Sequence, residues 1–165
     1  MVFGMSLSAF TAVHTVLSLI GIAAGLVVLL QMLRGQFSKG WTWLFLFTTI
    51  MTSVTGYGFP ESQILPSHIV GGISLAVLAL ALYALFGKRL KGGWRAVYVV
   101  TAAIALYLNC FVGVVQAFMK LPPLHALAPT GSEPPFVAAQ LVTLAFLIAA
   151  GFLALRRFRP AAEIV

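Results

Sequence analysis

Long runs of apolar residues alternate with short polar breaks along the chain. A helix that crosses a membrane needs about 20 mostly apolar residues, and five runs reach or approach that length. The helices that these runs predict cover about residues 6–33, 41–57, 68–86, 94–118 and 135–155. The pattern therefore predicts an all-α fold, in which residues 1–165 form a single transmembrane domain, a polytopic bundle of five helices.

Two of the polar breaks are distinctive. The break from Tyr57 to His68 contains Glu61, one of only three acidic residues in the chain. The break over residues 121–135 is rich in proline, which lacks a backbone donor and fixes φ. We therefore expect this second break to be extended and irregular.

The composition indicates that the predicted bundle is surrounded by lipid. Of the 165 residues, 61% are hydrophobic and only 8% are charged, whereas a soluble domain carries roughly 25% charged residues. There is too little polar surface to cover a water-soluble protein, so the main partner is the lipid bilayer. The net charge of +7 does not indicate nucleic-acid binding, because the basic residues flank apolar runs and form no basic face.

The basic residues also predict the orientation of the chain. With five helices, successive loops alternate sides, and one side receives nine of the ten basic residues: Arg34, Lys39, Lys88, Arg89, Lys91, Arg95, Arg156, Arg157 and Arg159. The other side receives Lys120, with Glu61 and Glu133. Because positively charged loops stay in the cytoplasm, we expect the N-terminus outside and the C-terminus inside.

Measured from these basic ends, several polar residues fall at one depth. Counting about 20 residues outward along each helix reaches the outer boundary of the membrane. The polar residues predicted at or just above this boundary are His14, Glu61, His68, Gln116, His125 and Glu133. Asn109 shares a helix face with Gln116 but lies deeper in the membrane. All three histidines thus belong to the outer part of the predicted bundle.

Three interpretations of this outer layer remain open. The residues could simply gather where helices meet water, with Asn109 and Gln116 bonding neighbouring helices. They could line a ligand-binding pocket formed by His14, Glu61, His68, Asn109, Gln116, His125 and Glu133. His14 and His68, the two helix-borne histidines, could also bind a divalent metal or act as axial ligands of a b-type haem.

Other chemistry finds little support in the sequence. The chain has no nucleotide-binding loop and no Ser/His/Asp grouping, so we expect no enzymatic activity. The stretch Thr55–Gly58 is similar to the potassium-channel filter, Thr-Val-Gly-Tyr-Gly. A filter, however, would require residues 41–55 to form a re-entrant helix and would place Arg34 and Lys39 outside. A glycine-rich helix end before Pro60 is the simpler interpretation.

Two stretches carry a resemblance to known proteins. One is the segment from Gly93 to Val115, which includes Tyr-Val-Val-Thr and Ala-Leu-Tyr-Leu-Asn, and the other runs from His125 to Phe136. Both resemble a family of small, uncharacterised inner-membrane proteins, mostly from alphaproteobacteria. The resemblance is best in the second half of the chain and weakest in the first helix. It implies a multi-pass protein of the bacterial cytoplasmic (inner) membrane and implies no function.

The sequence therefore leads to one working hypothesis and two alternatives. The hypothesis is a small integral membrane protein whose polar, histidine-bearing outer face binds a ligand, a cofactor or a partner protein. The first alternative is a cytochrome-like protein that binds haem b or a metal through His14 and His68. The second is a structural subunit of a larger membrane complex, or a homo-oligomer.

Overall fold

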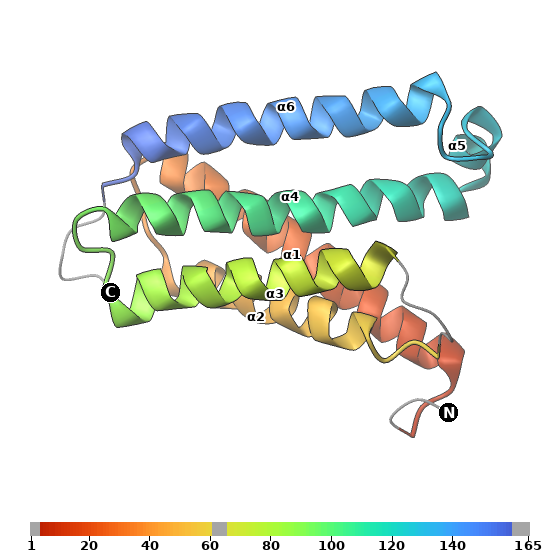
Figure 1. Cartoon of the computed structure of the whole chain (residues 1–165), viewed down its shortest axis with the longest axis horizontal. Helices are drawn as coiled ribbons and strands as arrows, with labels where there is room; N and C mark the ends of the chain where they lie inside the picture. The colour runs from red at the N-terminus through yellow and green to blue at the C-terminus, as the bar shows by residue number, and fades with distance from the viewer. Residues whose placement is uncertain (1–3, 61–65, 160–165) are drawn as a thin grey trace.

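The computed structural model describes residues 4–60 and 66–159, which form helices and no β-strand (Figure 1). The elements in chain order are α1 (Leu7–Leu33), α2 (Lys39–Gly56), α3 (Pro66–Leu82), the π-helical turn η1 (Tyr83–Gly87), α4 (Trp94–Lys120), α5 (Pro122–Leu127) and α6 (Pro134–Arg157). Within these ranges, four helices are long and apolar enough to cross a membrane: α1, α3 continued by η1, α4 and α6.

The long helices lie close to their predicted positions. Their ends differ from the predicted ends by no more than two residues when η1 is counted with α3. The prediction for residues 121–135 was partly wrong, because α5 occupies Pro122–Leu127. Its prolines stand in the first helical turn, where the missing N–H would have had no partner within the helix. The proline content was therefore compatible with a short helix.

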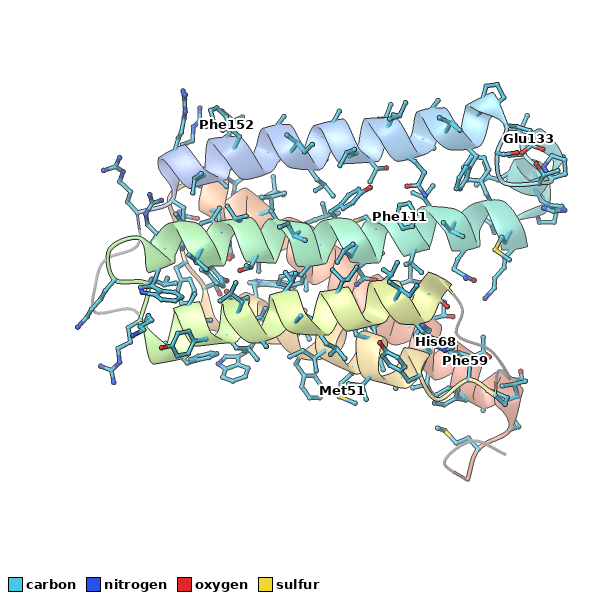
Figure 2. The ribbon with its side chains drawn as sticks, in the orientation of Figure 1. Met51, Phe59, His68, Phe111, Glu133 and Phe152 are labelled. Atoms are coloured by element: carbon cyan, nitrogen blue, oxygen red, sulfur yellow. The ribbon has the colours of Figure 1, made fainter. Side chains whose placement is uncertain are left out.

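The helices form a bundle in which α4 is central. Figure 1 shows α6 running along one side of α4 and α3 along another, while α1 crosses obliquely behind them beside α2. Figure 1 also shows that α1 begins and α6 ends at opposite ends of the bundle. Side chains tipped with nitrogen gather at the end where α4 begins and α6 finishes (Figure 2). We call this the basic end.

Helices α1, α2 and α4 approach one another closely near the middle of α4. Phe45 of α2 and Leu106 of α4 are both about 1% exposed, and they meet at Gly25 of α1. A Cβ at Gly25 would lie 2.6 Å from Leu106 Cδ1 and 2.8 Å from Phe45 Cε2. Glycine is therefore required for this approach, as small residues commonly are where membrane helices cross closely.

An arginine anchors the end of α6 to the start of α4. The guanidinium of Arg95 donates hydrogen bonds from Nη1 to the carbonyl oxygens of Leu155, at 2.8 Å, and Phe158, at 2.6 Å. These carbonyls lie where helix α6 ends and would otherwise lack partners. The positive charge also complements the negative end of the helix dipole. Phe158 is fully buried beside Tyr98, so the chain is held after its last helical turn.

Helices α1 and α4 diverge away from the basic end. They are joined near their middles by a hydrogen bond of 2.8 Å from Ser18 Oγ to Asn109 Oδ1. Beyond this bond the two helices separate, as Figure 1 shows from their different inclinations. The separation leaves room for the cavity described next.

Candidate functional site

A cavity of about 600 Å³ lies in the half of the bundle away from the basic end. Its walls come from α1, α2, α3 and α4, together with residues just after α2 and α4. On α4 the lining extends from Leu108 to Lys120, which corresponds to about 18 Å of helix at 1.5 Å per residue. The cavity therefore reaches from the helix ends to the middle of the bundle. Most of its lining surface is apolar, although many of the lining residues carry a polar side chain.

His14 of α1 contributes one of these polar side chains. Its ring atom Nδ1 lies 2.8 Å from the hydroxyl oxygen of Thr55 on α2. That hydroxyl lies 2.7 Å from the Met51 carbonyl, to which it can donate. The rings of His14 and Phe59 also meet in a T-shaped arrangement, with centroids 5.2 Å apart and planes at 87°. Contacts with α2 and Phe59 therefore fix the imidazole at the cavity wall.

His68 occupies another part of the lining, near the start of α3. Its ring stacks on Tyr57, with centroids 5.4 Å apart and planes at 16°. The Tyr57 hydroxyl donates a hydrogen bond of 2.6 Å to the His68 carbonyl. Glycine at 71 and 72 makes room for the tyrosine, because a Cβ there would lie 3.3 Å from its Cε2 and 3.0 Å from its hydroxyl, respectively. Figure 2 shows His68 and Phe59 on the same side of the bundle.

The deep end of the cavity is polar. Ser18 and Asn109 bond across it, and Ser53 of α2 bonds to Ser74 of α3 at 3.0 Å. Thr49 is 1% exposed, and its hydroxyl oxygen has no hydrogen-bond partner within the described part of the chain. Gly21 lets α1 approach this group, because a Cβ there would lie 2.9 Å from Asn109 Nδ2 and 3.1 Å from Thr49 Oγ1. Buried polar groups thus form the deep end of the cavity.

Most hydroxyl groups of α2 donate a hydrogen bond to a carbonyl of the same helix. Thr48, Thr52 and Ser53 donate to carbonyls four residues earlier, at 2.6, 2.8 and 3.0 Å. Such bonds let serine and threonine sit inside a membrane helix without an outside partner. The threonine-rich composition of α2 is therefore compatible with an apolar environment.

Four of the predicted site residues line this cavity: His14, His68, Asn109 and Gln116. His125 is exposed on α5, and Glu133 precedes α6, so neither lines the cavity. Glu61 lies outside the described residues. The sequence-based prediction is thus correct for four residues on three helices that line one cavity. It is wrong for His125 and Glu133, which belong to the segment between α4 and α6.

Glu133 instead organises the turn before α6. Its carboxylate accepts hydrogen bonds from the amide of Thr130 at 3.0 Å, the hydroxyl of Thr130 at 2.9 Å and the amide of Ser132 at 3.0 Å. The bond from the Thr130 amide is the main reason that the pKa of Glu133 falls to about 2. The carboxylate also stands at the start of α6, where the helix dipole favours negative charge.

Several lining residues were not in the predicted set. They include Tyr57, Lys120 and the hydroxyl residues Ser18, Ser53 and Ser74. Three of them carried a signal in the sequence. Lys120 is the one basic residue predicted on its side of the membrane, and Tyr57 belongs to the same polar break as His68. Ser18 stands four residues after His14 and so shares its helix face. Ser53 and Ser74 could not be singled out, because hydropathy does not say which helices are neighbours.

The histidines were also predicted as metal or haem ligands. Within residues 4–60 and 66–159, no three His, Cys, Asp or Glu side chains are close enough to bind one ion. His14 and His68 do line the same cavity, and the hydrogen bond at His14 engages Nδ1, which leaves Nε2 as the ring atom for a ligand. Among the described His, Cys, Asp and Glu residues, these two imidazoles are therefore the candidate ligands for a metal or haem in the cavity.

Comparison of the chain with models of protein families, with curated proteins and with solved structures gave no match, so the candidate function depends on the cavity itself.

Proposed function

We propose that this chain is a five-span protein of the bacterial inner membrane that binds a small amphipathic molecule in the cavity between α1, α2, α3 and α4. The observation that carries the proposal is the cavity itself, with a volume of about 600 Å³ and a lining that is mostly apolar. Small-molecule sites typically enclose about 300–1,000 Å³ and combine an apolar lining with a few converging polar groups.

The fifth span in this proposal is α2. It has 18 residues, which extend about 27 Å at 1.5 Å per residue and nearly match a hydrocarbon core of about 30 Å. Trp43, Phe47 and Val54 are exposed on one face of α2, while Thr42, Thr48 and Thr49 are buried on the other. This division suits a helix with lipid on one side and the bundle on the other.

If five helices cross the membrane, nine of the ten basic residues fall on the same side of it. The loop between α1 and α2, the loop between η1 and α4, and the end of α6 then all face the cytoplasm, following the positive-inside rule. In this orientation the N-terminus and the cavity are at the outer face. The resemblance of the second half of the chain to bacterial inner-membrane proteins supports the same location.

The lining favours binding over catalysis. The described lining residues include neither Asp nor Glu, the side chains that most often join histidine in general acid–base chemistry. What remains is a set of hydrogen-bonding groups, one lysine and several aromatic rings. Such a set can hold and orient a molecule.

Filling the cavity tests this proposal. Ala117 lines the cavity, and the exposed Ala138 lies about as far from the outer end of α6 as Ala117 does from that of α4. We expect the wild type and Ala138→Trp to retain the same small molecule during purification in mild detergent, and Ala117→Trp to lose it. Native mass spectrometry and analysis of an organic extract measure this. Equal content in all three proteins, or no bound molecule in the wild type, would contradict the proposal.

A haem or metal protein is the second candidate, because His14 and His68 line one cavity. It predicts a Soret band or stoichiometric metal in the purified wild type. Both should be lost in the double variant His14→Ala with His68→Ala. A wild-type protein with neither signal eliminates this candidate and leaves the first one standing.

A further inference from the structure

The hydrogen bonds around His14 determine what its imidazole offers to the cavity. The Thr55 hydroxyl has one proton, and its oxygen lies 2.7 Å from the Met51 carbonyl and 2.8 Å from His14 Nδ1. Two oxygens this close would repel each other without a proton between them, and a carbonyl can only accept a hydrogen bond. The hydroxyl proton of Thr55 therefore points to the Met51 carbonyl. The Thr55 oxygen must then accept from Nδ1, which carries the ring proton. Nε2 is left with its lone pair and is a hydrogen-bond acceptor.

This acceptor belongs to a side chain of the cavity wall. Within the described part of the chain, the hydrogen bond that the His14 ring forms is the one to Thr55, through Nδ1. His14 is part of the cavity lining. A ligand that donates a hydrogen bond would therefore gain a partner at this point, whereas a ligand with only acceptor groups would not.

The wall beside His14 is aromatic. Phe59 meets His14 in a T-shaped arrangement and packs against Phe10 with ring centroids 5.0 Å apart. Tyr57, two residues before Phe59, also lines the cavity and stacks with His68. Aromatic side chains pack favourably against other rings in offset or edge-on geometry. The neighbourhood of the acceptor therefore suits a flat ring.

The cavity wall on α4 has a different polarity. Gln116 and Lys120 both line the cavity and stand four residues apart, on one face of the helix. Lysine can only donate, and glutamine can both donate and accept. A ligand that donates to His14 can thus accept from α4 through the same oxygen or a second one.

We propose that the cavity takes a phenol-type amphiphile, an aromatic ring with a hydroxyl group and an apolar tail. The hydroxyl donates to Nε2 of His14, the ring packs beside Phe59 and Tyr57, and the ligand oxygen accepts from Lys120 or Gln116. This inference rests on the proposed function of the cavity as an amphiphile site, and it adds the chemical class of the ligand. No bond is made or broken in it.

Two probes, one with a hydroxyl donor and one in which a methyl group replaces the hydroxyl proton, test the inference. They are 4-nonylphenol and its methyl ether, 4-nonylanisole, each titrated into the full chain in detergent by isothermal calorimetry. We expect the wild type to bind the phenol about tenfold more tightly than the ether, which is the effect of one net hydrogen bond. In His14→Leu the affinity for the phenol should fall to that for the ether, while the affinity for the ether stays the same.

Thr55→Val is the second variant, and it also covers the case in which His14→Leu does not fold. It keeps the shape of the side chain but removes the oxygen that holds the proton on Nδ1. We expect a partial loss of phenol affinity in Thr55→Val and none in Thr55→Ser. Equal affinity of the wild type for both probes, or no binding of either, would overturn the phenol inference.

Ala117→Trp separates this failure from failure of the proposed function. If both probes bind equally and Ala117→Trp blocks both, the cavity is an amphiphile site without a preference for a donor. If the probes bind equally to the wild type and to Ala117→Trp, they bind elsewhere, and the phenol inference fails. The proposed function is then decided by the molecule that copurifies with the wild type.

Discussion

Single residues at helix crossings determine how closely this bundle packs. Gly25 lets α1 touch Leu106 and Phe45, and Gly21 lets it approach Thr49 and Asn109. The spacing of these glycines along one helix face could be seen in the sequence. The side chains that pack against them could not be predicted, because a glycine in one helix does not indicate which side chain of another helix will contact it.

Gly25→Ala is expected to destabilise the fold. The added Cβ would lie within 3 Å of two buried side chains, and such overpacking costs about 1–3 kcal/mol. The matched control is Gly40→Ala in α2, because nothing lies within 4 Å of a Cβ at that position. Thermal unfolding in detergent compares the two, and equal stability of Gly25→Ala and the wild type would contradict the packing at this crossing.

The turn held by Glu133 should depend on pH in a defined direction. Its pKa in the fold is about 2, below its ordinary value of 4.5, so the carboxylate stabilises the turn fully above about 4.5. This stabilisation is lost as the pH falls through about 2. We expect the amide resonances of Thr130 and Ser132 to stay constant from pH 7 to 4.5 and to shift only near pH 2, as measured by NMR in detergent.

Glu133→Gln supplies the control for this titration. Its amides at Thr130 and Ser132 should exchange faster with solvent at pH 7, while those of the loop over 88–93 stay unchanged. A titration of Glu133 near 4.5 would show that the hydrogen bonds to Thr130 and Ser132 do not hold the carboxylate.

At the scale of helices, much of the architecture could be read from the sequence. Apolar runs and flanking basic residues predicted the long helices closely, because length and hydropathy are local properties. The short helix α5 was missed, because it begins with prolines and is too short to show a helical pattern of apolar residues. The neighbours of each helix were also beyond prediction. Lipid-facing and bundle-facing positions are both apolar in a membrane protein, so hydropathy cannot order the helices.

The anchor between α4 and α6 gives a prediction at this scale. Arg95→Gln removes a charged donor from two carbonyls at the end of α6, and hydrogen bonds to charged groups are worth about 1.5–3 kcal/mol each. We expect faster amide exchange in the last turn of α6 and a lower unfolding temperature.

Lys91→Gln is the matched control for Arg95→Gln. It removes one positive charge from the adjacent loop, where Lys91 is exposed, and it leaves both bonds from Arg95 to α6 in place. If both variants lose the same stability, the effect comes from net charge and not from the bonds to Leu155 and Phe158.

For the whole molecule, the divergence of α1 and α4 decides where a site can form. Depth in the membrane could be counted from the basic ends of the sequence, and this count placed His14, His68 and Gln116 at one level. It could not separate residues that face a cavity from residues that lie in a loop at the same depth. His125 and Glu133 share the level but not the cavity, because their positions depend on α5 and on the turn before α6.

The central claim is an outward-facing cavity inside the membrane, and the accessibility of matched cysteines tests it most directly. Val112 lines the cavity and Val142 is exposed on α6 outside it. Both lie eight residues from the end of their helix that is farther from the basic end, a distance of about 12 Å. Each is replaced by cysteine in a Cys110→Ala background. Intact cells are then treated with a small, charged, membrane-impermeant methanethiosulfonate.

We expect the cysteine at position 112 to react from outside, and the reaction to stop when Ala117→Trp fills the cavity. The cysteine at position 142, which faces lipid, should stay unmodified. An unreactive cysteine at 112, or equal reaction at 112 and 142, would contradict an outward-facing cavity in this protein.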